Sequence, residues 1–162
     1  MSDVKNEIAV MGLGNPFMSD EGIGVKLVTH LRDRKWVPQH IDVLDMGTTG
    51  MGVLHAMTGR RKVIFIDCAL MGEPPGTLRR FTPEQAVSRK VQTRLSLHEG
   101  DLLHTIRLAG QTDDGPKEII IFGIQPAKVG PGEELTPTLS QRFDDYIEVL
   151  LQELAMASSS PT

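Results

Sequence analysis

Short apolar runs alternate with longer segments of helical periodicity along this chain, and this alternation constrains the fold more than any other feature. The apolar runs predict strands at 8–13, 41–44, 63–66 and 118–124, with a further edge strand at 77–81. Helical periodicity covers 21–34, 51–57, 98–108 and 138–155. A β-α-β-α order of this kind predicts a mostly parallel sheet with helices packed on both faces.

The chain has 162 residues, which is enough for one domain with its own hydrophobic core. Hydrophobic residues make up 40% of it and charged residues 23%, as is ordinary for a globular protein. We expect a single α/β domain over residues 1–157. Residues 158–162 are small and polar, and we expect them to form a disordered tail.

The charge of the chain argues against nucleic-acid and membrane-surface partners. The formal net charge is −4 at pH 7, and Lys and Arg form no dense run, whereas proteins that bind phosphate backbones carry basic patches. No export signal or membrane-spanning segment is visible in the sequence. We therefore expect a cytoplasmic protein that binds neither nucleic acid nor membrane. Cys68 is the only cysteine, so no internal disulfide is expected.

The segments that follow the predicted strands carry the candidate functional residues. These segments are 15–21, 45–49, 67–69 and 125–130. Parallel strands share a carboxyl edge, and open α/β sheets bind their ligands at that edge. We therefore expect the four segments to gather along one rim of the sheet.

A tight turn and an acidic pair mark the first of these segments. Gly12 and Gly14 allow the backbone to turn sharply after the first strand. Asp20 and Glu21 then stand where a helix begins, and the helix dipole favours negative charge at that position. Acidic residues in a first helical turn are also ordinary capping residues, so the pair alone does not distinguish a structural role from a functional one.

Asp67 and His98 are the other candidates. Asp67 closes an apolar strand, where a carboxylate costs free energy unless it caps a loop amide, is paired or binds a ligand. His98 lies at the predicted start of a later helix, where a lone histidine is more often structural or solvated than a ligand. Together Glu21, Asp67 and His98 form an O,O,N set suited to a divalent metal such as nickel, zinc or copper. Their spacing matches no established metal-binding motif.

Two other chemistries receive little support from the sequence. There is no Gly-x-Ser-x-Gly motif, and Cys68 has no neighbouring histidine, so catalysis by a serine or cysteine nucleophile is not indicated. The Gly12-Leu13-Gly14 turn is similar to the start of a dinucleotide-binding fingerprint, and Asp45 matches its ribose-binding acid. Phe17, however, stands where that fingerprint requires Gly or Ala.

One string of residues is specific enough to indicate a family. Residues 12–25 read Gly-Leu-Gly-Asn-Pro-Phe-Met-Ser-Asp-Glu-Gly-Ile-Gly-Val, and they resemble the opening of the nickel–iron hydrogenase maturation endopeptidases. The resemblance continues in order through 44–50, 66–67, 75–77, 97–98, 123–126 and 135–138. It therefore covers residues 8–154 with similar spacing, and the ordered series is more specific than any single motif.

The resemblance implies a fold and a metal-binding set. The family fold is a three-layer α/β/α sandwich, phosphorylase/hydrolase-like, with a five-stranded, mostly parallel mixed sheet. One strand of that sheet is antiparallel, and the segment near Thr77 fits it. The family's metal-binding Glu, Asp and His match Glu21, Asp67 and His98, and by the resemblance these residues also carry metal-assisted catalysis.

A second box in the family binds substrate. Asp45, Gly47 and Thr48 match this box, with Met46 at the position where the family commonly has Gly. By the resemblance, Asp45 and the Gly47-Thr48 turn position the tail of the substrate.

The resemblance further implies an activity. These endopeptidases remove a C-terminal extension from the precursor of the hydrogenase large subunit after nickel has been inserted. Nickel supplied by the substrate is the recognition element, and other divalent metals are expected to occupy the same site. The expected partner is the large-subunit precursor, and the expected state is a monomer. The alternative is a non-catalytic nickel-binding chaperone or hydrogenase assembly scaffold that uses the same rim.

Overall fold

The computed structural model describes residues 4–48, 50–88, 94–95 and 101–158. Its elements, in chain order, are β1 (Ile8–Leu13), the 3-10 helix η1 (Asp20–Gly22), α1 (Ile23–Arg34), β2 (Ile41–Gly47), α2 (Gly50–Met57), β3 (Lys62–Leu70), β4 (Leu78–Phe81), α3 (Pro83–Ser88), β5 (Arg94–Leu95), α4 (Asp101–Gly110), β6 (Glu118–Ile124), α5 (Pro137–Ser140) and α6 (Phe143–Ser158).

The strands of the described residues build one sheet in the order β2-β1-β3-β6-β4. β1 pairs in parallel with β2 and with β3, β3 pairs in parallel with β6, and β4 runs antiparallel to β6. The predicted five-stranded mixed sheet with one antiparallel strand is therefore confirmed. A short additional strand, β5, pairs antiparallel with Ala69 and Leu70 at the end of β3.

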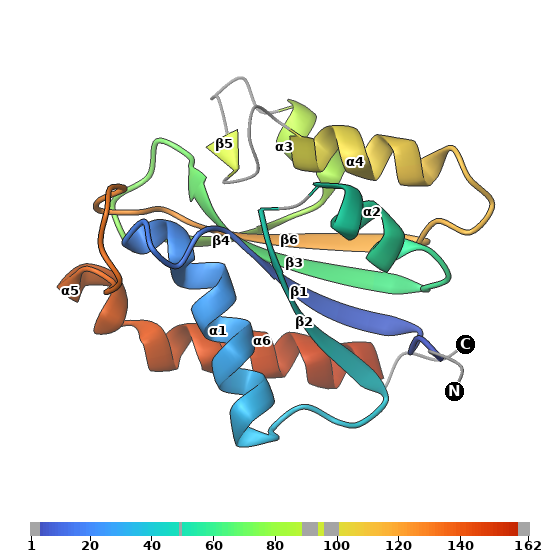
Figure 1. The fold of residues 1–162 in the computed structure, drawn as a ribbon, viewed down its shortest axis with the longest axis horizontal. Coiled ribbons are helices and arrows are strands. Elements are labelled where there is room, and N and C mark those ends of the chain that lie inside the picture. The colour runs from blue at the N-terminus through green and yellow to red at the C-terminus, as the bar shows by residue number, and fades with distance from the viewer. Residues whose placement is uncertain (1–3, 49, 89–93, 96–100, 159–162) are drawn as a thin grey trace.

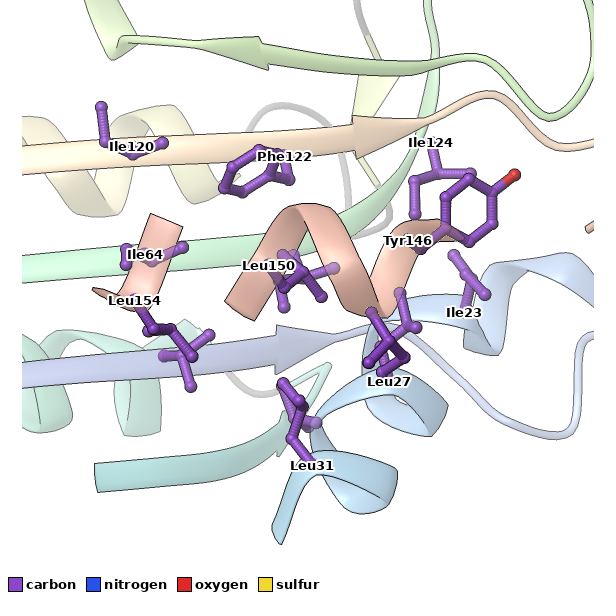
Figure 2. Close-up of a cluster of buried hydrophobic side chains, with 14 of the residues drawn as sticks. Ile23, Leu27, Leu31, Ile64, Ile120, Phe122, Ile124, Tyr146, Leu150 and Leu154 are labelled. Carbon is purple, nitrogen blue, oxygen red and sulfur yellow. The ribbon is translucent and has the colours of Figure 1, made fainter. Parts of the chain in front are cut away.

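Helices cover both faces of the sheet, which gives the three layers seen in Figure 1. α1 and α6 cover one face, and α2 and α4 cover the other. Side chains alternate along β3, so Ile64 and Ile66 pack in the cluster under α1 and α6, whereas Val63 and Phe65 pack in the cluster under α2 and α4. Figure 2 shows the first cluster, in which side chains of α1, α6, β3 and β6 meet between the layers.

Two glycines bring α1 very close to the sheet. A Cβ atom on Gly24 would lie 2.6 Å from the carbonyl oxygen of Leu13 and closer still to that of Ile66. A Cβ atom on Gly12 would lie 2.5 Å from Val28 and closer to the Gly24 carbonyl oxygen. Real Cβ atoms essentially never approach other atoms within 3.0 Å. Only glycine at these positions therefore allows the start of α1 to lie directly against β1 and β3.

Two charged side chains, Lys62 and Glu153, are buried at the opposite, amino edge of the sheet, and the exposed Arg80 binds to Glu153. Lys62 of β3 donates to Glu153 of α6 (3.2 Å), and Arg80 of β4 donates to the same carboxylate through Nε (2.7 Å) and Nη2 (3.1 Å). Burial opposes ionisation of Glu153, but the hydrogen bonds from Arg80 and Lys62 outweigh burial and lower its pKa below the usual value. This network attaches α6 to the sheet.

Three predicted elements have different bounds in the structure. The helix predicted at 21–34 begins as the 3-10 turn η1 and becomes α-helical only at α1. The strands predicted at 41–44 and 63–66 continue to Gly47 and Leu70. Both strands lengthen because neighbouring strands pair with the additional residues.

Two helices also differ from the prediction. The final helix predicted at 138–155 is divided into α5 and α6 at Gln141–Arg142, where no Gly or Pro marks a break. α3 was not predicted, although its capping box is visible in the sequence. Thr82 N donates to Gln85 Oε1 (2.9 Å), and Gln85 N donates to Thr82 Oγ1 (3.2 Å).

Parts of two predictions lie outside the described residues. α4 begins at Asp101, and the first residues of the helix predicted at 98–108 are not described. α6 ends at Ser158, and residues 159–162 of the predicted tail are not described either. Within the part of the chain that the structure describes, none of the helices has the length and apolar character needed to cross a membrane.

Candidate functional site

The loops that follow β1, β3 and β6 gather at the carboxyl edge of the sheet, as Figure 1 shows. Ser19 N donates to the carbonyl oxygen of Gly132 (2.9 Å), which joins the loop after β1 to the loop after β6. Gly14 N donates to the carbonyl oxygen of Gly47 (2.8 Å), which joins the same loop to the end of β2. The fold thus brings segments that are distant in sequence to one edge, as the parallel topology predicts.

Two of the predicted metal ligands, Glu21 and Asp67, lie on neighbouring elements of this edge. Glu21 is half-buried in η1, and Asp67 is fully buried in β3. η1 packs against β3, because the close approach at Gly24 fixes the start of α1 on the sheet. β3 does not end at Asp67 as predicted but continues to Leu70, and Asp67 pairs with Gly123 of β6. The backbone of Asp67 therefore belongs to the sheet and not to a loop.

The pKa of the Cys68 thiol depends on the charged groups at this edge. It is 4% exposed, and burial raises the pKa of its thiol most. The negative charges of Asp67, Glu21 and Asp20 raise that pKa further. The thiol therefore stays protonated and is not a nucleophile, in agreement with the core role expected of a lone cysteine. The same carboxylates concentrate negative potential at this end of β3, which favours a bound cation.

The predicted substrate-binding residues lie at the end of β2. Asp45 and Thr48 are exposed, and Gly47 lies between them with φ 57°. Asp45 Oδ1 accepts a hydrogen bond from Gly47 N (3.1 Å) and so stabilises this left-handed turn. The hydrogen bond from Gly14 N to Gly47 attaches the turn to the loop after β1. The structure thus places this box on the same edge as Glu21 and Asp67.

His98, the third predicted ligand, lies outside the described residues. Three residues before it, Leu95 of β5 pairs with Ala69, which is two residues beyond Asp67 on β3. Within the described ranges, there is no group of three or more His, Cys, Asp and Glu side chains that could hold a metal ion. A complete site therefore needs a donor beyond Glu21 and Asp67.

Two residues shape this edge although they are not among the predicted metal ligands or substrate-binding residues. Asp20 is fully buried and accepts hydrogen bonds from the loop after β6, so it differs in environment from the half-buried Glu21. Gln125 is 8% exposed, and its Oε1 accepts from the backbone amides of Met71 (2.7 Å) and Glu73 (3.3 Å). Gln125 thereby holds the loop after β3. Its sequence signals are its place directly after a strand and its position in the segment 123–126 that resembles the family.

Comparisons with known proteins relate this arrangement to characterised folds. Residues 25–153 match the family model described as hydrogenase maturation protease. The chain is 32% identical over 151 residues to the hydrogenase expression/formation protein HupD of Thiocapsa roseopersicina, a match that covers 92% of this chain and 68% of HupD. It is 32% identical to the hydrogenase 2 maturation protease of Escherichia coli strain K12, covering 91% of this chain and 90% of that protein. The solved structure of the E. coli hydrogenase maturating endopeptidase HybD is similar with a TM-score of 0.79 and 27% identity, over 93% of each chain.

Proposed function

The chain belongs to the family of hydrogenase maturation proteases, and we propose that it removes a C-terminal extension from the large-subunit precursor of a nickel–iron hydrogenase after nickel insertion. That it is an endopeptidase acting in hydrogenase maturation follows from the family. We further propose that the nickel carried by the precursor is the recognition element and that the chain acts as a monomer.

The observation that carries this proposal is the pair of carboxylates, Glu21 and Asp67, at the carboxyl edge of the sheet. Both raise the pKa of the Cys68 thiol through their charge, so both contribute to one region of negative potential. Carboxylate oxygens together with a neutral imidazole form a donor set that accepts nickel. Glu21 and Asp67 would supply two oxygen donors to such a cation, and His98 would add the nitrogen.

In the proposed reaction the nickel-bearing part of the precursor binds at this edge. Glu21, Asp67 and His98 would bind the nickel, which polarises a water molecule for attack on the scissile amide. The water oxygen adds to the carbonyl carbon, the C–N bond breaks, and the released amine takes up a proton. Cys68 is the only cysteine of the chain and is buried with its thiol protonated, so a thiolate nucleophile plays no part.

The end of β2 would bind the extension that is removed. Asp45 and Thr48 are exposed there, and Gly47 is attached to the loop that leads to Glu21 through the hydrogen bond from Gly14. The turn thus lies on the same edge of the sheet as the two carboxylates. We therefore propose that Asp45, Gly47 and Thr48 orient the tail of the precursor.

Incubation of the purified chain with nickel-loaded precursor tests the proposal, with the mass of the precursor as the readout. We expect the precursor to lose its C-terminal extension. A precursor that binds tightly in a pull-down assay but keeps its full mass after prolonged incubation would contradict proteolysis, and it would favour the chaperone or scaffold function.

A further inference from the structure

A single buried carboxylate joins η1 to both ends of the loop after β6. Asp20 is fully buried. Its Oδ2 accepts from the backbone amides of Ala127 (2.9 Å) and Lys128 (3.1 Å), and its Oδ1 accepts from the backbone amide of Thr136 (2.8 Å). The Thr136 hydroxyl also donates to the carboxylate, at 2.8 Å from Oδ2 and 3.1 Å from Oδ1. Asp20 therefore fixes the two ends of the segment 127–136 relative to η1.

The residue before Asp20 is held by the same segment. Ser19 N donates to the carbonyl oxygen of Gly132 (2.9 Å), and Ser19 Oγ donates to that of Gly130 (2.8 Å). Ser19 has φ 54° and ψ −123°, a conformation that a residue other than glycine keeps only where its surroundings enforce it. The position of η1 is therefore set by the segment 127–136 as well as by the start of α1.

We infer that Asp20 is a positioning residue for Glu21. Glu21 follows Asp20 directly in η1, so a displacement of Asp20 displaces Glu21 as well. The inference rests on the proposed function in that Glu21 is taken to act in precursor cleavage. Displacement of a reacting group by about 1 Å can cost on the order of 100-fold in rate. Loss of the Asp20 hydrogen bonds is therefore expected to slow cleavage although Asp20 itself does not touch the precursor.

Glu153 offers a matched control, because it is another buried carboxylate with several hydrogen bonds. It is 4% exposed and accepts from Lys62 and Arg80 at the amino edge, which is the end of the sheet opposite to Glu21. Asp20→Asn and Glu153→Gln each replace a buried carboxylate by the amide of the same shape. Both variants are expected to lose stability, because buried acceptors become donors. Only the first is expected to slow cleavage.

The experiment compares D20N, E153Q and the wild type at a temperature where circular dichroism shows all three to be folded. We expect D20N to lower kcat for nickel-loaded precursor at least about tenfold with little change in KM, and E153Q to stay within about twofold of the wild type. Hydrogen exchange gives a readout that needs no precursor. The amides of Ala127 and Thr136 should exchange at least about tenfold faster in D20N. A wild-type kcat in D20N, or equal losses of kcat in D20N and E153Q, would overturn the inference.

Thr136 provides a milder pair of variants, which keeps the inference testable if D20N does not fold. T136V removes the hydroxyl that donates to Asp20, and T136S keeps it. We expect T136S to match the wild type and T136V to lower kcat by about threefold or more, because T136V loses the hydroxyl bonds to Asp20 but keeps the bond from the backbone amide. Equal kcat values would overturn the inference. If the wild type leaves the precursor uncut, the proposed function fails. Hydrogen exchange at the amide of Gly22 then tests the positioning role, because this amide donates to the carbonyl oxygen of Ser19 (3.1 Å) within η1. We expect it to exchange faster in T136V and D20N than in the wild type. Unchanged exchange in both variants would overturn the inference.

Discussion

Gly24→Ala is the substitution for which the structure makes the sharpest stability prediction. The new Cβ atom would lie 2.6 Å from the carbonyl oxygen of Leu13 and closer still to that of Ile66. Both oxygens belong to the backbone of strands in the middle of the sheet, so neither can turn away as the end of a flexible side chain would. The start of α1 would have to move away from β1 and β3, and η1 with Glu21 would move with it.

The expected change in the free energy of unfolding of Gly24→Ala is the difference between two opposing effects. Overpacking of a well-packed core costs about 1–3 kcal/mol, and rigid backbone neighbours place Gly24→Ala at the upper end, about 3 kcal/mol. Alanine is favoured over glycine inside a helix by about 0.5–1 kcal/mol. The net loss in the free energy of unfolding is therefore about 2 kcal/mol or more, which corresponds to a fall in Tm of about 4–8 °C for a domain of this size.

Urea unfolding of Gly24→Ala measures this loss, and Gly110→Ala is the matched control. Gly110 is the last residue of α4, and a Cβ atom there would meet nothing within 4 Å apart from its chain neighbours and the backbone of its own helix. We expect Gly110→Ala to be neutral or to stabilise the protein by up to about 1 kcal/mol. Equal free energies of unfolding for the two variants would refute the idea that a close approach of α1 to the sheet requires glycine at position 24.

Three further predictions concern charged and reactive groups. Because the pKa of Glu153 is lowered in the folded protein, its contribution to stability is present above its unfolded-state pKa and is lost as pH falls through the folded-state pKa. The free energy of unfolding should therefore fall more steeply between about pH 6 and about pH 3 in the wild type than in E153Q, and parallel profiles would contradict this. Because burial and neighbouring carboxylates raise the pKa of Cys68, a thiol reagent should modify the native protein no faster than it unfolds, and C68A should still cleave the precursor. A folded C68A variant without activity would show that the thiol has a catalytic role. Single replacement of Glu21, Asp67 or His98 by Ala should abolish cleavage while the protein stays folded, whereas a Tm that falls in parallel with activity would indicate structural roles.

The sheet was predictable because hydrophobic periodicity records which residues become buried. β1 and β6 have the predicted bounds, Ile8–Leu13 and Glu118–Ile124. The predicted end of β3 was wrong for a physical reason: Asp67 looks like the end of an apolar run, but pairing with β6 and β5 continues the strand to Leu70. Pairing between distant strands leaves no local signal in the sequence.

The gathering of the candidate segments at one edge of the sheet was predictable, but the different burial of the two acidic residues was not. A shared carboxyl edge follows from parallel topology alone. Asp20 is the buried member of the pair because its carboxylate accepts hydrogen bonds from backbone amides of the loop after β6. Two of these amides, of Ala127 and Thr136, lie 107 and 116 residues further along the chain. No local pattern encodes contacts of that range. His98 lies outside the described residues, and its role as the third ligand remains a prediction.

The claim that the carboxyl edge recognises nickel already present in the precursor is tested most directly by a paired cleavage measurement. The same large-subunit precursor, prepared nickel-loaded and nickel-free, is incubated with this chain, and the loss of its C-terminal extension is followed by mass spectrometry. We predict cleavage of the nickel-loaded precursor only, and cleavage of the nickel-free precursor once nickel has been inserted into it. Equal cleavage of the two forms would contradict recognition through the metal.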